Sequence, residues 1–279
     1  MINSQKSLPL ILLFTLLTMS SKSSTIAIRL HPRRNNTSSP PSAAAAPPPP
    51  PSSSTSSDSG NEKFCLSWRL GVEANNVVAW RTVPTECQTE VESYMIDGQY
   101  EGDLDLVMQQ IFTFLDSIPI SSNSSFDAWV LDVDDTCLSN LYYYKTKRFG
   151  CEPYDPAGFR AWASKGRSPA IPSVLELFKK LTEKGFKVFL VSGRDEETLG
   201  QATLNNLRNQ GFFGYERLIL RSGEYKGQSA VRYKSDIRQK LEKEGYRIWG
   251  NVGDQWSDLR GDSIGNRTFK LPNPMYFVP

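Results

Sequence analysis

Short apolar runs recur along the second half of this chain, and helical patterns separate them. The runs that predict strands lie at 128–131, 187–191, 217–220, 246–252 and 267–271. Apolar spacing near 3.6 residues, together with proline and glycine at the ends of several segments, predicts helices at 99–118, 172–184, 195–209 and 235–244. Strands that alternate with helices predict an α/β fold with a mainly parallel sheet and helices on both faces.

The first 60 residues do not have the composition of a folded domain. An early lysine and an apolar stretch at 8–19, too short to span a bilayer, predict a secretory signal peptide over 1–24. An uncleaved signal anchor is the alternative. Residues 25–60 are rich in proline and serine, which predicts an extended linker. We expect one folded domain over 61–279 and no membrane segment after signal cleavage.

The cysteines of 61–279 and the glycosylation sequons suit the secretory pathway, with the cell wall, the extracellular space or the vacuole as the destination. This part has a net charge of −2, so we expect no nucleic acid as partner. Four cysteines behind a signal peptide predict disulfides. Three pairings exist, and we favour the two that close short loops, Cys65–Cys87 and Cys137–Cys151. Glycosylation sequons lie at Asn35, Asn36, Asn123 and Asn266.

Acidic residues follow two of the predicted strands. Asp132 and Asp134 come after the first strand, and Asp254 and Asp258 come after the fourth. The carboxyl ends of parallel strands meet at one edge of a sheet, where α/β proteins build their sites. Asp132, the Asp134 carbonyl and Asp254 are candidate Mg²⁺ ligands, and Asp258 would bind through water or orient Asp254. Asp132 and Asp134 point to one side of an extended chain, so one could attack phosphorus while the other transfers the proton of the leaving group.

A hydroxyl and a lysine are predicted to reach the same edge. Ser192 follows the second predicted strand and could hydrogen-bond phosphoryl oxygens, with Gly193 and Thr136 as further substrate-binding candidates. Lys234 precedes a predicted helix and could neutralise charge in the transition state, a role for which Lys226 is the alternative. Each cluster alone could be a turn, a cap or a solvated helix start. Their order and their positions after strands together indicate a Mg²⁺-dependent phosphatase.

Other catalytic classes lack residues that they need. The sequence G-D-S-I-G at 261–265 matches a serine-hydrolase pattern, but the chain has a single histidine, His31, in the N-terminal segment. The pattern D-x-D at 132–134 also begins an EF-hand loop, but the sixth and twelfth positions are Cys137 and Tyr143 instead of glycine and glutamate. No Walker P-loop is present in the sequence.

The four clusters together resemble the haloacid dehalogenase (HAD) superfamily, with D-x-D-x-T at 132–136, Ser192, Lys234, and G-D-x-x-x-D at 253–258. Segments 67–69, 72–76, 132–140, 191–196, 226–229 and 250–259 are similar to plant (class B) acid phosphatases related to vegetative storage proteins. The resemblance implies a Rossmann-like core with a small cap, Mg²⁺ as cofactor and hydrolysis of small phosphomonoesters. By motif match it implies that Asp132 is the nucleophile and that Asp134 is the general acid/base. It also implies that Ser192 and Lys234 bind the phosphate and that Asp254 binds the metal.

Two structural and functional alternatives stay open at this point. The aromatic insert at 142–171 could cover the site as a cap, or its rings could pack a satellite core around a Cys137–Cys151 bridge. Some storage relatives have lost the nucleophile, whereas Asp132 is present here. The sequence therefore favours an acid phosphatase over a vegetative storage or defence protein with weak or no activity, and over a protein displayed at the wall through its Pro/Ser segment. A homodimer is compatible with the sequence.

Overall fold

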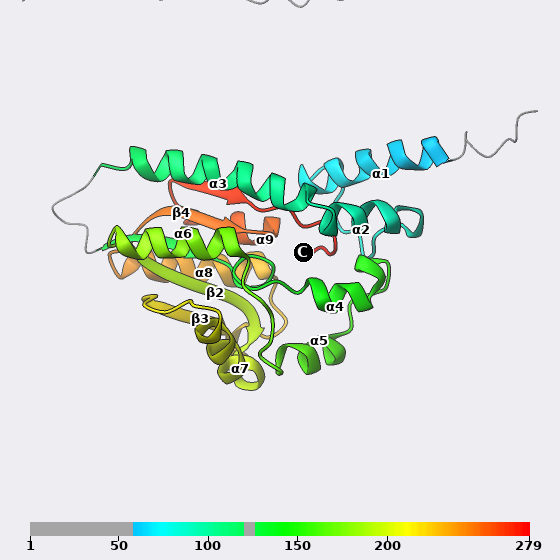
Figure 1. The fold of residues 1–279 in the computed structure, drawn as a ribbon. Coiled ribbons are helices and arrows are strands. Elements are labelled where there is room, and N and C mark those ends of the chain that lie inside the picture. Colours follow the sequence, from blue (N-terminus) through cyan, green and yellow to red (C-terminus); the bar gives the residue numbers. More distant parts are fainter. Residues whose placement is uncertain (1–57, 120–125) are drawn as a thin grey trace, which may run out of the picture. The chain divides into compact units, whose positions relative to one another are not determined.

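Five strands form one sheet in which every neighbouring pair is parallel, in the order β3-β2-β1-β4-β5 (Figure 1). The computed structural model describes residues 58–119 and 126–279. The strands are β1 (Asp127–Leu131), β2 (Lys187–Asp195), β3 (Arg217–Arg221), β4 (Arg247–Gly253) and β5 (Arg267–Lys270). This confirms the predicted α/β fold. The predicted signal peptide, the linker up to residue 57 and the sequon at Asn123 lie outside the described residues.

Helices cover both faces of the sheet, as predicted. The helices are α1 (Asp58–Glu73), α2 (Gln88–Ile96), α3 (Gln99–Ser117), α4 (Leu141–Thr146), α5 (Pro156–Ala163), α6 (Pro172–Glu183), α7 (Glu196–Asn209), α8 (Ala230–Lys243) and α9 (Trp256–Leu259). Trp129 and Leu131 of β1 pack in one core with α3 and α6, whereas Ala128 and Val130 pack in a second core with α8. The alternation along β1 explains why the apolar run from Ala128 to Leu131 can serve two cores.

Helix α8 begins five residues earlier than predicted. The Ser229 side chain accepts a hydrogen bond from the Arg232 N–H and caps the helix. Buried Ala230 and Tyr233 extend the apolar stripe toward the N-terminus. The predicted start at residue 235 placed Lys234 just before the helix. Instead Lys234 lies within the helix, and its side chain is buried.

The segment before the sheet is helical, although only α3 was predicted there. Helix α1 begins at Asp58, within the last residues of the predicted linker, and a disulfide joins Cys65 of α1 to Cys87. None of the helices in the described ranges combines the length and the apolar character needed to cross a bilayer.

The predicted Cys137–Cys151 disulfide is wrong, because both cysteines are free thiols. Cys137 is fully buried in the turn after β1. Helix α4 and a 3₁₀ turn (Arg148–Gly150) separate the two cysteines, and the Cys151 thiol faces the carbonyl of Pro84 at 3.8 Å. Short separation in sequence therefore did not bring these two sulfur atoms together.

Candidate active site

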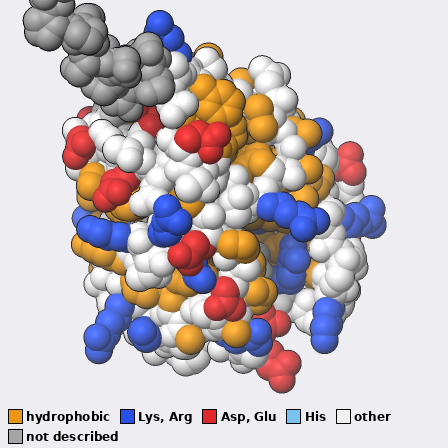
Figure 2. All heavy atoms as spheres, turned by 90° about the vertical axis from the view of Figure 1, so that its right-hand side faces the viewer, with side chains coloured by type: hydrophobic (Ala, Val, Ile, Leu, Met, Phe, Trp, Pro, Cys, Tyr) orange, Lys and Arg blue, Asp and Glu red, His pale blue; other side chains and the backbone are white. Residues whose placement is uncertain are grey.

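A pocket of about 760 Å³ opens over the carboxyl ends of β1, β2 and β4. Figure 2 shows this face of the molecule hollowed, with basic side chains at the border of the hollow. Tyr154 and Phe159 of the insert at 142–171 line the pocket. Tyr143, Tyr144 and Phe149 of the same insert are buried, so its rings also pack a core, without the expected bridge.

Four predicted residues meet at the floor of the pocket. The side chains of Asp132, Asp254 and Asp258 are buried, and they offer ligand oxygens within 4.8 Å of one another. The ammonium group of Lys234 donates hydrogen bonds to Asp132 and, at 2.6 Å, to Asp258. Three buried carboxylates with one lysine leave negative charge uncompensated, which fits a divalent cation with oxygen ligands.

Burial and the charges of the neighbouring side chains shift the pKa values of this group. Burial favours the neutral form of Lys234, but the carboxylates of Asp132 and Asp258 outweigh it and raise the pKa of the ammonium group above its ordinary value. Burial raises the pKa of Asp132, and the attraction of Lys234 opposes this shift. Burial also raises the pKa of Asp254 to about 7. Lys234 is therefore a permanent cation beside Asp132.

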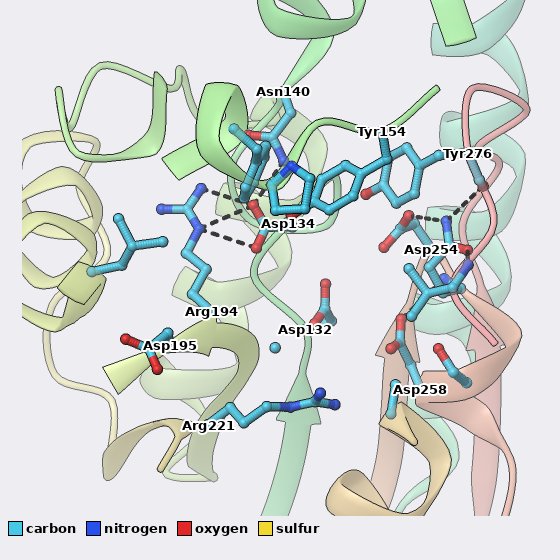
Figure 3. A pocket seen from close by; sticks show the side chains of 18 of the residues that line it. Asp132, Asp134, Asn140, Tyr154, Arg194, Asp195, Arg221, Asp254, Asp258 and Tyr276 are labelled. Carbon is cyan, nitrogen blue, oxygen red and sulfur yellow. Dashed lines mark hydrogen bonds and ion pairs between the residues drawn. The ribbon is translucent and has the colours of Figure 1, made fainter. Parts of the chain in front are cut away.

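Asp134 lies on another side of the pocket, fixed by two residues for which the sequence predicted no role. Arg194 donates from Nε to Asp134 Oδ2 at 3.0 Å and from Nη2 to Oδ1 at 2.8 Å. Asn140 donates from Nδ2 to Asp134 Oδ1 at 2.7 Å. Figure 3 shows Arg194 and Asn140 converging on Asp134, away from Asp254 and Asp258. In the sequence, only their proximity to two of the motifs could have indicated these roles, since Asn140 lies a few residues past Asp134 and Arg194 two residues past Ser192.

Two predicted substrate-binding residues direct their hydroxyl groups toward backbone N–H groups instead of into the pocket. The hydroxyl of Ser192 is buried and accepts a hydrogen bond from the Arg194 N–H at 3.1 Å. The hydroxyl of Thr136 is buried and accepts one from the Asp254 N–H at 3.1 Å. Gly193 lines the pocket, and so does the exposed Lys226, the alternative to Lys234.

The segment after β5, residues 271–279, forms a further wall of the pocket that was not predicted from the sequence. Tyr276, Phe277 and Val278 line the pocket. The Tyr276 hydroxyl donates a hydrogen bond to Asp135 at 2.9 Å, and its ring stacks on Tyr144 of α4 at 4.7 Å. Neither apolar periodicity nor a recognised motif marks this segment in the sequence. Only the folded structure reveals its contact with residues that lie more than a hundred positions earlier.

Comparison with known proteins agrees with this geometry. Residues 52–279 match the model of the HAD superfamily, subfamily IIIB (acid phosphatase). Acid phosphatase 1 of Solanum lycopersicum is 43% identical over 218 residues, which cover 78% of this chain and 85% of that protein. Vegetative storage protein 1 of Arabidopsis thaliana is 39% identical and covers 77% of this chain and 79% of its own length.

The fold is also similar to a solved structure. The class C acid phosphatase from Bacillus anthracis superposes with a TM-score of 0.56 at 20% sequence identity, over 78% of this chain and 86% of that chain. At this identity the likeness concerns the fold alone. The family match and the two plant relatives carry the assignment, and the chain belongs to subfamily IIIB of the HAD superfamily, the acid phosphatases.

Proposed function

We propose that this protein is a Mg²⁺-dependent acid phosphatase that hydrolyses small phosphomonoesters through a phosphoenzyme on Asp132. The observation that carries the proposal is the contact of Asp132 with Lys234 on the floor of the pocket, beside two further buried carboxylates. A carboxylate next to a permanent cation can accept an incoming phosphoryl group whose oxygens would otherwise repel it.

The residues of the pocket divide the reaction into two displacements. In the first, an oxygen of Asp132 bonds to phosphorus, the bond to the leaving oxygen breaks, and the protonated Asp134 gives that oxygen its proton. In the second, a water oxygen bonds to phosphorus, Asp134 takes a proton from this water, and the bond to Asp132 breaks to release phosphate. Arg194 forms a salt bridge with the ionised form of Asp134, which is the form that accepts a proton.

The acidic residues of the floor supply the metal site in this proposal. Asp132, the backbone carbonyl of Asp134, Asp254 and Asp258 would hold Mg²⁺. A bound Mg²⁺ would offset the negative charge of the phosphoryl oxygens. Lys234 would act on the same oxygens from α8, and Gly193 would leave room for the substrate at the end of β2.

The test is hydrolysis of p-nitrophenyl phosphate by the full chain from pH 4 to 8, with Mg²⁺ and with EDTA. We expect turnover that requires the metal and falls by at least a thousandfold in Asp132→Asn, because the amide cannot form the phosphoenzyme. Asp262→Asn is the matched control, since Asp262 is exposed and lies outside the pocket. Turnover that survives Asp132→Asn would contradict the mechanism.

A storage or defence role is the second candidate, because vegetative storage protein 1 and the stem 31 kDa glycoprotein of Glycine max are each 39% identical to this chain. A storage role requires bulk accumulation, so the abundance of the protein in tissue separates the two candidates. Passage through the secretory pathway suits both, and the exposed Asn266 at the start of β5 is the proposed glycosylation site within the described residues. High abundance without turnover would favour storage.

A further inference from the structure

The segment after β5 contacts the candidate metal ligand Asp254 directly. Asn273 donates a hydrogen bond from its side-chain amide to Asp254 Oδ2 at 2.7 Å. Gln255 donates a second one to the same oxygen, also at 2.7 Å. Both amides are buried, with 2% and 6% of their surface exposed. Figure 3 shows Tyr276, which belongs to this segment, and Asp254 on the same side of the pocket, away from Arg194.

The orientation of both amides is fixed by the backbone that follows. The side-chain oxygen of Asn273 accepts a hydrogen bond from the Met275 N–H at 2.9 Å, and that of Gln255 accepts one from the Val278 N–H at 3.0 Å. A backbone N–H is always a donor, so each amide must turn its oxygen toward the segment and its NH₂ group toward Asp254. The opposite amide orientation would place donor against donor.

The two oxygens of Asp254 are therefore not equivalent. Oδ2 accepts two short hydrogen bonds, which use both of its lone pairs. Within residues 58–119 and 126–279, Oδ1 accepts one side-chain hydrogen bond, a long one of 3.4 Å from the Thr136 hydroxyl. Only Oδ1 keeps the capacity to coordinate a cation, so Asp254 can offer one oxygen but not two.

We propose that Asn273 and Gln255 are positioning residues that hold Asp254 as a ligand with a single available oxygen and thereby favour Mg²⁺ over Ca²⁺. This inference rests on the proposed metal-dependent function. Mg²⁺ requires compact octahedral coordination, whereas Ca²⁺ accepts more ligands and often takes both oxygens of a carboxylate. Hydrogen bonds from outside the coordination shell typically change metal affinity by about 10–100-fold.

The segment that holds Asn273 is itself anchored to the N-terminal part of the domain. The Asn273 N–H donates to Glu73 Oε1 at 2.8 Å, and Lys270 donates to Glu73 Oε2 at 2.8 Å. Glu73 ends α1, the helix that carries the Cys65 disulfide. The position of Asn273 is thus set by two elements that lie far apart in the sequence.

The test is calorimetric titration of the full chain with Mg²⁺ and, separately, with Ca²⁺. We expect Asn273→Ala to weaken Mg²⁺ binding by about 10–100-fold and Ca²⁺ binding by less than threefold, because Oδ2 becomes available to the larger ion. Gln255→Met should act in the same direction and serves as the second variant if Asn273→Ala does not fold. The half-saturating Mg²⁺ concentration for phosphatase activity should rise, with kcat largely restored at high Mg²⁺.

Asn206→Ala is the matched control. Asn206 is buried, and its side chain accepts a hydrogen bond from the Ser168 N–H and donates one to the Ser168 carbonyl, away from the pocket. It should lose stability but keep its Mg²⁺ and Ca²⁺ affinities. If the unaltered protein binds no Mg²⁺, the metal-dependent function fails together with this inference. If that protein binds Mg²⁺ and Asn273→Ala or Gln255→Met keeps the same preference for Mg²⁺ over Ca²⁺, only the inference is overturned.

Discussion

Two buried carboxylates link the stability of the metal-free protein to pH. Burial raises the pKa of Asp254 and that of Asp135 to about 7, although each accepts hydrogen bonds that favour its charged form. In an unfolded chain both would titrate near 3.8. Between these values the folded state binds more protons than the unfolded state, so the free energy of unfolding decreases as pH rises from about 4 to 7.

We therefore expect Asp254→Asn to change how the melting temperature depends on pH in EDTA. With one titrating group removed, the melting temperature should fall less, or rise more, between pH 5 and 7.5 than it does in the unaltered protein. Mg²⁺ should raise the melting temperature more at pH 7.5 than at pH 5, because its carboxylate ligands must lose their protons first. Thermal unfolding by circular dichroism checks both, with Asp262→Asn as the control. An equal Mg²⁺ effect at the two pH values would contradict the assignment.

At the scale of single residues, the sequence predicted the charged groups of the pocket floor but not the residues that orient them. Asp132 and Asp254 could be found because they directly follow apolar runs, and strand ends converge in an α/β fold. Asn273 follows a predicted strand as well, but an asparagine there has no distinctive chemistry until Asp254 is seen beside it. Thr136 lies in the turn after β1 and Ser192 near the carboxyl end of β2, yet their hydroxyl groups accept hydrogen bonds from the backbone N–H groups of Asp254 and Arg194.

At the scale of elements, the contact between β1 and β4 depends on a residue without a side chain. Trp129 of β1 is fully buried, stacks on Phe269 of β5 and lies opposite Gly250 of β4. A Cβ atom on Gly250 would come within 2.1 Å of the Trp129 ring. The ring therefore occupies the space that a side chain at position 250 would need, and the strand before Asp254 can approach β1 only because of this glycine.

We expect Gly250→Ala to reduce the free energy of unfolding by at least about 1–3 kcal/mol, since the ring cannot move without disturbing the core. Gly200→Ala is the control within α7, where a Cβ meets nothing within 4 Å, and it should stabilise the protein by up to about 1 kcal/mol. Urea denaturation of both variants measures the difference. Similar unfolding midpoints for the two would show that the strand contact tolerates the added methyl group.

The elements themselves were the most predictable part of the structure, and their limits show where local patterns stop being sufficient. The strands were found to within a few residues because their apolar runs are short and bounded by polar residues. Helix α8 was placed too late because Ser229 resembles any loop serine, although Ala230 and Tyr233 already continue the apolar stripe into the first turn. Helices α1 and α2 were missed, since the contacts that hold them are not local. The Cys65–Cys87 disulfide joins α1 to the turn before α2, and Glu73 at the end of α1 contacts α9 and the segment after β5.

At the scale of the whole molecule, the ends of the domain meet and support the pocket. Trp256 of α9 donates a hydrogen bond to the backbone of Glu73, to which the segment after β5 is also bound. The Cys65–Cys87 disulfide constrains the helix that ends at Glu73. A crosslink outside the pocket thus stabilises the part of the chain on which one wall of the pocket rests, an arrangement that suits an oxidising compartment.

The redox state of the four cysteines gives a direct check of this architecture. Under non-reducing conditions the unfolded chain should show two free thiols, and the native protein should react only at Cys151, because Cys137 is fully buried. Burial raises the pKa of both thiols, so even Cys151 should react slowly. Thiol titration followed by peptide mapping identifies the labelled residues, and absence of free thiols would restore the Cys137–Cys151 bridge.

The same disulfide should also contribute to the stability of the fold. Its partners are 22 residues apart. Closing a loop of this size lowers the entropy of the unfolded chain and thereby adds about 3 kcal/mol to the free energy of unfolding. The double variant Cys65→Ser/Cys87→Ser should therefore unfold at lower urea concentration, whereas Cys151→Ser should change the midpoint little because its thiol is unpaired and half-buried. Since Glu73 lies in the helix that this disulfide constrains, the double variant should also bind Mg²⁺ more weakly than Cys151→Ser does. Loss of stability without any loss of Mg²⁺ affinity would mean that the contacts of Glu73 suffice to hold the pocket wall without the crosslink.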